Sequence, residues 1–313
     1  MPRDLRDAVV VVSGASSGVG RAAALAFAEL GASVVVAARG PDALAEVADA
    51  CRARGVAALA VPGDVADAAA VDELGARAVA TFGRIDVWVE AAAVLLAGRF
   101  GEEPVDEVER LVATNVLGSV HGARTALRQF RRQGHGTLVL VSSVLGVVQN
   151  PVVPVYVMSK FAVRGLGLSL RHLVAQEPGI AVTVVLPGPI DTPMFERAAN
   201  HTGFGLRSVP PAIAPERVAA AVVSAARRPR RQVPVGFTAR AILLADRVAP
   251  RLTEWTVARV SASLLVRREP VPDTSGAVLE PGRPARPHGP WRRSRLRRRA
   301  GAGVGWVLTR HGR

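Results

Sequence analysis

The sequence has little of three kinds of feature, and each shortage narrows the class of protein. Its one cysteine, Cys51, excludes an intramolecular disulfide framework and agrees with a reducing compartment. Aromatic residues make up only 4% of the chain, so a core drawn from its 49% hydrophobic residues must be aliphatic. No stretch of about 18 uninterrupted apolar residues indicates a membrane span, and the apolar run 8–12 is too short for a secretory signal. We therefore expect a cytoplasmic protein, with peripheral membrane association as the alternative.

Acidic residues are missing from the end of the chain. Residues 283–313 contain ten arginines and no acid, so they carry most of the net charge of +14. From residue 269 onward Pro, Gly and Arg dominate, and such a composition cannot bury enough apolar surface to offset chain ordering. We expect 269–313 to form a disordered basic tail. This tail could contact nucleic acid or an anionic membrane surface, although basic chain ends often have no specific role.

Tyrosine and lysine are almost absent, and the single copy of each lies four positions from the other. Tyr156 and Lys160 are the only residues of their types, and all other Lys or Arg positions hold arginine. Residues four apart share one face of a helix. A neighbouring cation favours the phenolate, so we expect the pKa of Tyr156 to fall from about 10 toward neutrality. The pair would then act as a proton donor and acceptor, the alternative being a chance pair on a surface helix.

Short apolar runs alternate with helical stretches along most of the chain. This order is typical of βαβ units, and it predicts an α/β fold with three layers, α/β/α, around a doubly wound parallel sheet. Residues 188–214 are rich in Pro and Gly and predict a mobile substrate lid. Residues 237–268 predict a C-terminal helical extension, broken at Pro250. The expected strands are 8–13, 33–38, 56–61, 85–90, 136–142, 180–186 and 232–235, and the expected helices are 18–30, 41–54, 66–82, 104–132, 154–176 and 215–228.

A glycine-rich turn joins the first expected strand to the first expected helix. Glycines there allow a tight turn and close approach of the backbone to a pyrophosphate, and the helix N-terminus supplies free N–H groups. The motif predicts a dinucleotide-binding turn, the alternative being a purely structural turn. Its candidate cofactor-binding residues are Ser13, Gly14, Ser16, Ser17, Gly18, Val19 and Gly20.

The end of the second expected strand indicates which dinucleotide is bound. An acid there would bind the ribose 2′-hydroxyl and disfavour a 2′-phosphate. The chain has Ala37-Ala38-Arg39 at this point, with no acid before Asp42. Arg39 can pair with a 2′-phosphate, so we predict NADP, with NAD as a possible cofactor. A solvated loop arginine is the alternative.

The glycine spacing, G-x-x-x-G-x-G, together with Tyr-x-x-x-Lys resembles the short-chain dehydrogenase/reductase (SDR) family of the compact, non-extended type. The resemblance runs from about residue 5 to 236 and implies one Rossmann-type catalytic and cofactor-binding domain over 1–236. Ser143 lies 13 residues before Tyr156, as in the family. The other matching landmarks, in chain order, are Asp64-Val65, Asn115, Ser142-Ser143 and the segment Pro187-Gly188-Pro189-Ile190-Asp191-Thr192.

The resemblance implies an oxidoreductase that interconverts an alcohol and a carbonyl by hydride transfer. Tyr156 would exchange the proton of the substrate hydroxyl, and Ser143 would hold the substrate oxygen. Lys160 would lower the pKa of Tyr156 and bind the nicotinamide ribose, while Asn115 would link Lys160 through water to solvent. The further cofactor-binding residues that it implies are Asp64, Val65, Ala91, Asn115, Tyr156, Lys160, Pro187, Gly188, Ile190 and Thr192.

The chain departs from the family in one segment. Glu90-Ala91-Ala92-Ala93 stands where the family has Asn-Asn-Ala-Gly, and Glu90, near the expected sheet end, has no evident role. One alternative is therefore a catalytically silent, nucleotide-binding member of the family, and another is a protein localised to polyanions or a membrane surface by its tail.

The remaining expectations concern the substrate, metals and assembly. The apolar stretch 144–148 suggests a hydrophobic small molecule as the alcohol or carbonyl substrate, in a pocket built from 94–101, 144–155 and 189–212. Four of the histidines, at 121, 135, 172 and 201, lack metal-type spacing to acids or Cys, so we expect no metal site. The resemblance implies a homodimer or homotetramer that pairs helices 104–132 and 154–176.

Overall fold

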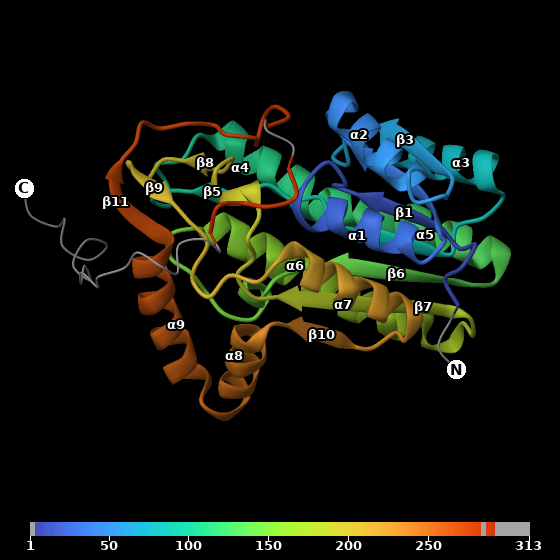
Figure 1. Cartoon of the computed structure of the whole chain (residues 1–313). Coiled ribbons are helices and arrows are strands. Elements are labelled where there is room, and N and C mark those ends of the chain that lie inside the picture. Colours follow the sequence, from blue (N-terminus) through green and yellow to red (C-terminus); the bar gives the residue numbers. More distant parts are fainter. Residues whose placement is uncertain (1–3, 283–285, 292–313) are drawn as a thin grey trace, which may run out of the picture.

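The computed structural model describes residues 4–282 and 286–291. Seven of its strands form one parallel sheet, as the alternating pattern predicts, in the order β10-β7-β6-β4-β1-β2-β3 (Figure 1). The strand order reverses at β1, which pairs with β2 on one side and β4 on the other. Ligands of such sheets bind beyond the carboxyl ends of the strands at this reversal. These strands are β1 Val9–Ser13, β2 Ser33–Ala38, β3 Ala58–Pro62, β4 Val87–Glu90, β6 Gly136–Val141, β7 Ile180–Pro187 and β10 Gln232–Val235.

Helices cover both faces of the sheet because successive strand residues point to opposite sides. Val10 and Val12 of β1 pack in the same apolar cluster as helices α1, α2 and α7. Val11, between them, belongs to the opposite cluster with α3, α5 and α6. The three-layer Rossmann-like fold is thereby confirmed. The bounds of these helices are α1 Gly18–Glu29, α2 Pro41–Arg52, α3 Ala68–Phe82, α5 Gly118–Gln133, α6 Pro154–Leu173 and α7 Pro215–Arg227.

The helix expected over 104–132 contains an irregular turn. It consists of α4 Val105–Val112, a π-helical turn Ala113–Leu117, and α5. A π-turn adds one residue to the helical ring and often marks a functional position. Here it carries Asn115, whose side chain is fully buried.

The segment 188–214, predicted to be a mobile lid, contains short paired strands. Strand β8 Ala199–Asn200 pairs with β5 Leu96–Ala97, and β9 Phe204–Leu206 pairs with β11 Val266–Pro270. Backbone pairing of this kind satisfies polar groups that a long irregular connection would leave to solvent.

Two helices follow the sheet, as predicted for 237–268. Helix α8 Phe237–Val248 and helix α9 Pro250–Leu265 meet at Pro250. None of the helices in the described part of the chain is long and apolar enough to cross a membrane.

The expectation of disorder from residue 269 onward is wrong for the described part of that segment. We call residues 271–282 and 286–291 the C-terminal strap. Figure 1 shows this chain, in orange-red, returning after β11 toward the carboxyl end of the sheet. Val278 is completely buried, and Ala277 N donates to Arg197 O at 2.7 Å. The amino-acid composition did not predict this packing, because many of the strap's contacts are hydrogen bonds of its backbone groups, which do not depend on side-chain type. The remaining residues of the predicted tail, 283–285 and 292–313, lie outside the described part.

Candidate active site

The glycine-rich turn is packed too closely for side chains. Gly14 has a φ of +66°, and a Cβ there would lie 2.6 Å from the backbone of Ala92. A Cβ on Gly20 would lie 2.2 Å from the carbonyl oxygen of Gly14. Ser17, the N-cap of α1, makes no side-chain capping bond, so the helix leaves backbone N–H groups directed at the turn. This cradle fits the diphosphate of a dinucleotide.

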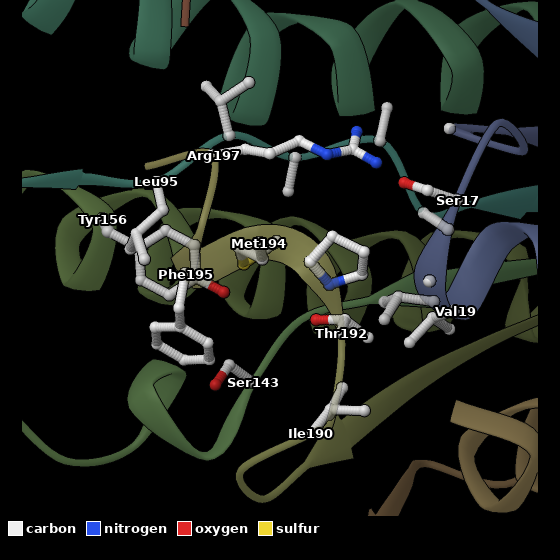
Figure 2. A pocket seen from close by; sticks show the side chains of 18 of the residues that line it. Ser17, Val19, Leu95, Ser143, Tyr156, Ile190, Thr192, Met194, Phe195 and Arg197 are labelled. Atoms are coloured by element: carbon white, nitrogen blue, oxygen red, sulfur yellow. The ribbon is translucent and has the colours of Figure 1, made fainter. Parts of the chain in front are cut away.

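One cavity of about 320 Å³ joins this turn to Tyr156 and Lys160. Figure 2 shows the hydroxyls of Tyr156 and Ser143 within it, with Ser17 and Val19 at the other end. Ser13 and Asn115 do not line the cavity. The predicted residues that do line it are Gly14, Ser16, Ser17, Gly18, Val19, Gly20, Arg39, Asp64, Val65, Ala91, Ser143, Tyr156, Lys160, Pro187, Gly188, Ile190 and Thr192.

Burial is the cause of the pKa shifts of both Tyr156 and Lys160. Lys160 Nζ lies 5.5 Å from the centre of the Tyr156 ring and donates to Val141 O at 3.3 Å. Burial lowers the pKa of Lys160 to about 8, so its ammonium form still prevails at neutral pH. Burial raises the pKa of Tyr156 well above its ordinary value, which contradicts the expected fall toward neutrality. The phenol therefore holds its proton and can serve as a donor.

Ser142 and Ser143 directly follow strand β6 and make different contacts. Ser143 Oγ accepts a hydrogen bond from Leu145 N at 3.1 Å, which leaves its O–H able to donate to a substrate oxygen. Ser142 Oγ donates to Lys160 O at 2.8 Å and so ties the strand end to helix α6. Both serines line the cavity, but the hydroxyl hydrogen of Ser142 is used in holding the framework, whereas that of Ser143 can bind a substrate.

Asn115 connects the turn after β4 to helix α6. Its Oδ1 accepts from Val94 N at 2.8 Å, and its Nδ2 donates to Val94 O and to Ser159 Oγ, both at 3.0 Å. Ser159 Oγ in turn donates to Tyr156 O at 2.7 Å. The asparagine therefore positions the turn of α6 that carries the tyrosine and the lysine.

Glu90 has a structural role that the sequence did not reveal. Its two carboxylate oxygens accept from Ser13 Oγ and Trp88 Nε1, both at 2.5 Å. The carboxylate packs against Gly122 of α5, where a Cβ would lie 1.5 Å from Oε1. Burial raises the pKa of Glu90 to about 7. The acid ties β1 to β4 beneath the glycine-rich turn, and no local pattern in the sequence could have paired it with Gly122.

Arg39 is held by the C-terminal strap. Its Nη1 donates to Val278 O and Leu279 O, both at 3.0 Å, and its Nη2 donates to Ala277 O and Glu280 O at 2.6 and 3.1 Å. Burial lowers the pKa of Arg39, although an arginine stays charged at any cellular pH. Arg39 lines the cavity, but the N–H groups of its two terminal nitrogens are already used by the strap.

Two further arginines near the cavity were not singled out from the sequence. Arg110 of α4 forms an ion pair with Asp64, the predicted adenine contact. Figure 2 shows the guanidinium of Arg197 extending across the cavity toward Ser17. An arginine in this position suits a phosphate, but so arginine-rich a chain gives no signal to distinguish it. Within the described residues, no cluster of His, Cys, Asp and Glu is arranged to hold a metal ion.

Comparison with known proteins identifies the family of the chain. The family model for short chain dehydrogenases matches residues 8–203, and the chain belongs to this family. An uncharacterized oxidoreductase of Bacillus subtilis, YxnA, is 36% identical over 263 residues, which cover 82% of this chain and 73% of that protein. An L-rhamnose 1-dehydrogenase (NAD(P)(+)) of a Sphingomonas species is 39% identical over 191 residues, covering 60% of this chain and 74% of the relative.

A solved structure shares the fold. The crystal structure of a short chain dehydrogenase/reductase from Burkholderia phymatum in complex with NAD superimposes with a TM-score of 0.71 at 26% identity. The match covers 81% of this chain and 96% of that one. The chain is thus an oxidoreductase of a family that uses NAD or NADP.

Proposed function

We propose that the protein is an NADP(H)-preferring oxidoreductase that interconverts an alcohol and a carbonyl, with Tyr156 as the general acid and base. One observation carries this proposal: the hydroxyls of Tyr156 and Ser143 open into the cavity that also contains the glycine-rich turn. Lys160 lies beneath the tyrosine ring on the same helix. A proton donor, an oxygen-binding hydroxyl and a dinucleotide cradle therefore share one space.

The nicotinamide cofactor supplies the hydride when it is bound. The backbone of the glycine-rich turn and Arg197 would hold its diphosphate, and the segment Pro187–Thr192 would lie over its nicotinamide ring. In carbonyl reduction, Ser143 Oγ donates a hydrogen bond to the substrate oxygen. Tyr156 Oη then gives that oxygen its proton, and the nearby Lys160 ammonium stabilises the phenolate that remains.

Asn115 has a second proposed role in restoring the proton. The proposal that it links Lys160 through water to solvent rests on its position between the turn after β4 and helix α6. In carbonyl reduction, a water on this path would carry a proton from solvent to Lys160, from which the Tyr156 phenolate regains its proton.

The substrate end of the cavity favours a hydrophobic small molecule. Apolar side chains line it from three parts of the chain: Val144 and Leu145 after β6, Val153 before α6, and Met194 and Phe195 after β7. Removing such surface from water stabilises a bound apolar ligand by about 25 cal/mol per Å².

NADP preference is supported by the end of β2. That end has no acid to bind a ribose 2′-hydroxyl and has Arg39 beside the cavity. The relatives include a dehydrogenase named for both cofactors and a solved complex with NAD, so the family alone does not decide the preference.

A homodimer is proposed from the surface of α5 and α6. Val120 of α5 and Met158 and Phe161 of α6 are apolar and 36–50% exposed. Helices that leave apolar side chains on one surface commonly bury them against a second copy.

A screen of carbonyl compounds, followed by the loss of NADPH absorbance, tests the proposed function. We expect turnover with an apolar ketone or aldehyde, and slower turnover with NADH. Tight binding of the dinucleotide without turnover of any compound would favour a catalytically silent, nucleotide-binding protein.

A further inference from the structure

The C-terminal strap surrounds the residue that is proposed to recognise NADP. The carbonyl oxygens of four successive residues, Ala277 to Glu280, accept hydrogen bonds from the two terminal nitrogens of Arg39 at 2.6–3.1 Å. Carbonyls satisfy the donors but bring no negative charge to the guanidinium. Asp64, an acid whose charge acts on Arg39, forms its ion pair with Arg110. Among residues 4–282 and 286–291, Arg39 is therefore hydrogen-bonded without an anionic partner of its own.

A 2′-phosphate would need the same N–H groups. Arg39 follows the last residue of β2 and lines the cavity together with Gly40, Ala277 and Pro281. A phosphate bound there would form charge-assisted bonds, which are about twice as strong as bonds to neutral carbonyls. The phosphate and the strap carbonyls cannot use the same donors at once.

We infer that residues 277–280 are a specificity-determining element that competes with the 2′-phosphate of NADP(H) for Arg39. The docked strap weakens NADP(H) binding selectively, and binding of NADP(H) releases residues 277–280 from the guanidinium. NAD(H) has no 2′-phosphate, so it leaves these carbonyls in place. This inference rests on the proposed function, because it assumes that the dinucleotide binds beside Arg39.

The strap is docked tightly enough to compete. Gly276 has a φ of +53°, and a Cβ on it would lie 2.4 Å from the carbonyl oxygens of Arg197 and Ala198. Val278 is buried in an apolar cluster with Ala198. His201, bonded to Glu107 at 2.7 Å, also lies 3.5 Å from Asp273 of the strap.

Residues 286–291 form a second anchor of the strap. Gly289 N donates to Asp191 O at 3.2 Å, and Trp291 N donates to Asp191 Oδ1 at 2.9 Å. Gly18 N also donates to Arg286 O at 3.4 Å, at a group that either dinucleotide would approach. Displacement of residues 286–291 is therefore common to both cofactors, and only residues 277–280 distinguish them.

The test replaces one anchor of the strap in the full-length chain. Gly276→Ala places a Cβ against two carbonyls and loosens residues 277–280 without touching Arg39. The control is Gly55→Ala, since Gly55 has a similar left-handed φ of +82° but no atoms within 4 Å of a Cβ. Calorimetric titration with NADP⁺ and NAD⁺ gives the two dissociation constants for each protein.

We expect the preference for NADP⁺ over NAD⁺ to rise at least about fivefold in Gly276→Ala, the size of one hydrogen bond's net contribution. The control should keep the preference of the unaltered chain. A preference in Gly276→Ala that matches the control within about twofold would overturn the inference. If neither dinucleotide binds the unaltered chain, the proposed function fails and takes the inference with it.

Hydrogen exchange on the unaltered chain gives a second test that needs no variant to fold. Saturating NADP⁺ should speed exchange of the amides of residues 277–280 relative to saturating NAD⁺. Equal or slower exchange with NADP⁺ would show that the strap covers both cofactors alike, which contradicts competition for Arg39.

Discussion

Replacing Glu90 with glutamine should change how stability depends on pH. Glu90 is 4% exposed, and its carboxylate accepts hydrogen bonds from Ser13 and Trp88. Glutamine has nearly the same shape: its Oε1 can accept from the indole, and its amide can donate to Ser13 Oγ. The variant therefore imitates the protonated acid and cannot become charged.

The expected size follows from the pKa of Glu90. Burial raises it from 4.5 to about 7, so between these values the folded chain holds a proton that the unfolded chain has lost. The folded state binds more protons in this window, and the free energy of unfolding therefore falls as pH rises through it. A shift of this size corresponds to about 3 kcal/mol, all of it lost above the folded pKa. The uncharged side chain of Glu90→Gln does not cause this loss of stability at high pH.

Denaturant unfolding at several pH values measures the difference. The free energy of unfolding of Glu90→Gln, minus that of the unaltered chain, should rise by about 2–3 kcal/mol between about pH 5 and about pH 8. Glu73→Gln, at an exposed glutamate of α3, is the matched control and should show no such rise. If the Glu90→Gln profile runs parallel to that of the unaltered chain, the reasoning about buried charge is wrong.

Three further predictions test other parts of the site. Ala38→Asp combined with Arg39→Ala should shift the preference from NADP toward NAD by more than about 1 kcal/mol, and an unchanged ratio of kcat/KM for the two cofactors would contradict it. Light scattering at micromolar concentration should give a dimer that Phe161→Glu dissociates, whereas a monomeric unaltered chain would refute the α5–α6 interface. Burial disfavours the charged form of His201, but Glu107 and Asp273 outweigh this effect and raise its pKa. The charged histidine therefore stabilises the fold fully below about pH 6.5 and loses this effect as pH rises through the raised pKa. His201→Gln should accordingly lower the free energy of unfolding below about pH 6.5, and this loss should vanish at higher pH. A pH-independent loss would exclude a contribution from the charged histidine.

The sequence predicted the features that depend on local pattern. Strands of β-branched residues and the glycine-rich turn are encoded by neighbours in the chain, so the parallel sheet and the cradle at Gly14 followed from them. Tyr156 and Lys160 were found because each is the only residue of its type, at helical spacing.

Features that depend on distant contacts were missed or predicted wrongly. The pKa of Tyr156 was expected to fall, but its direction is decided by burial that only the folded chain shows. Glu90 packs on Gly122 from another element, and Arg39 is held by backbone carbonyls of the strap, which carry no side-chain signature. In the π-turn at Asn115 the backbone hydrogen bonds span one residue more than in an α-helix. The spacing of apolar residues, which predicted the helix, does not reveal this change.

The central claim is that Tyr156 transfers the proton, and Tyr156→Phe tests it most directly. The variant keeps the ring that packs over Lys160 and removes only the hydroxyl. Single-turnover oxidation of bound NADPH by a carbonyl substrate should slow by at least about 10²-fold, the lower range for loss of a general acid, while calorimetric binding of NADPH stays unchanged. A near-normal rate with normal binding would contradict the assignment of Tyr156 as the proton donor.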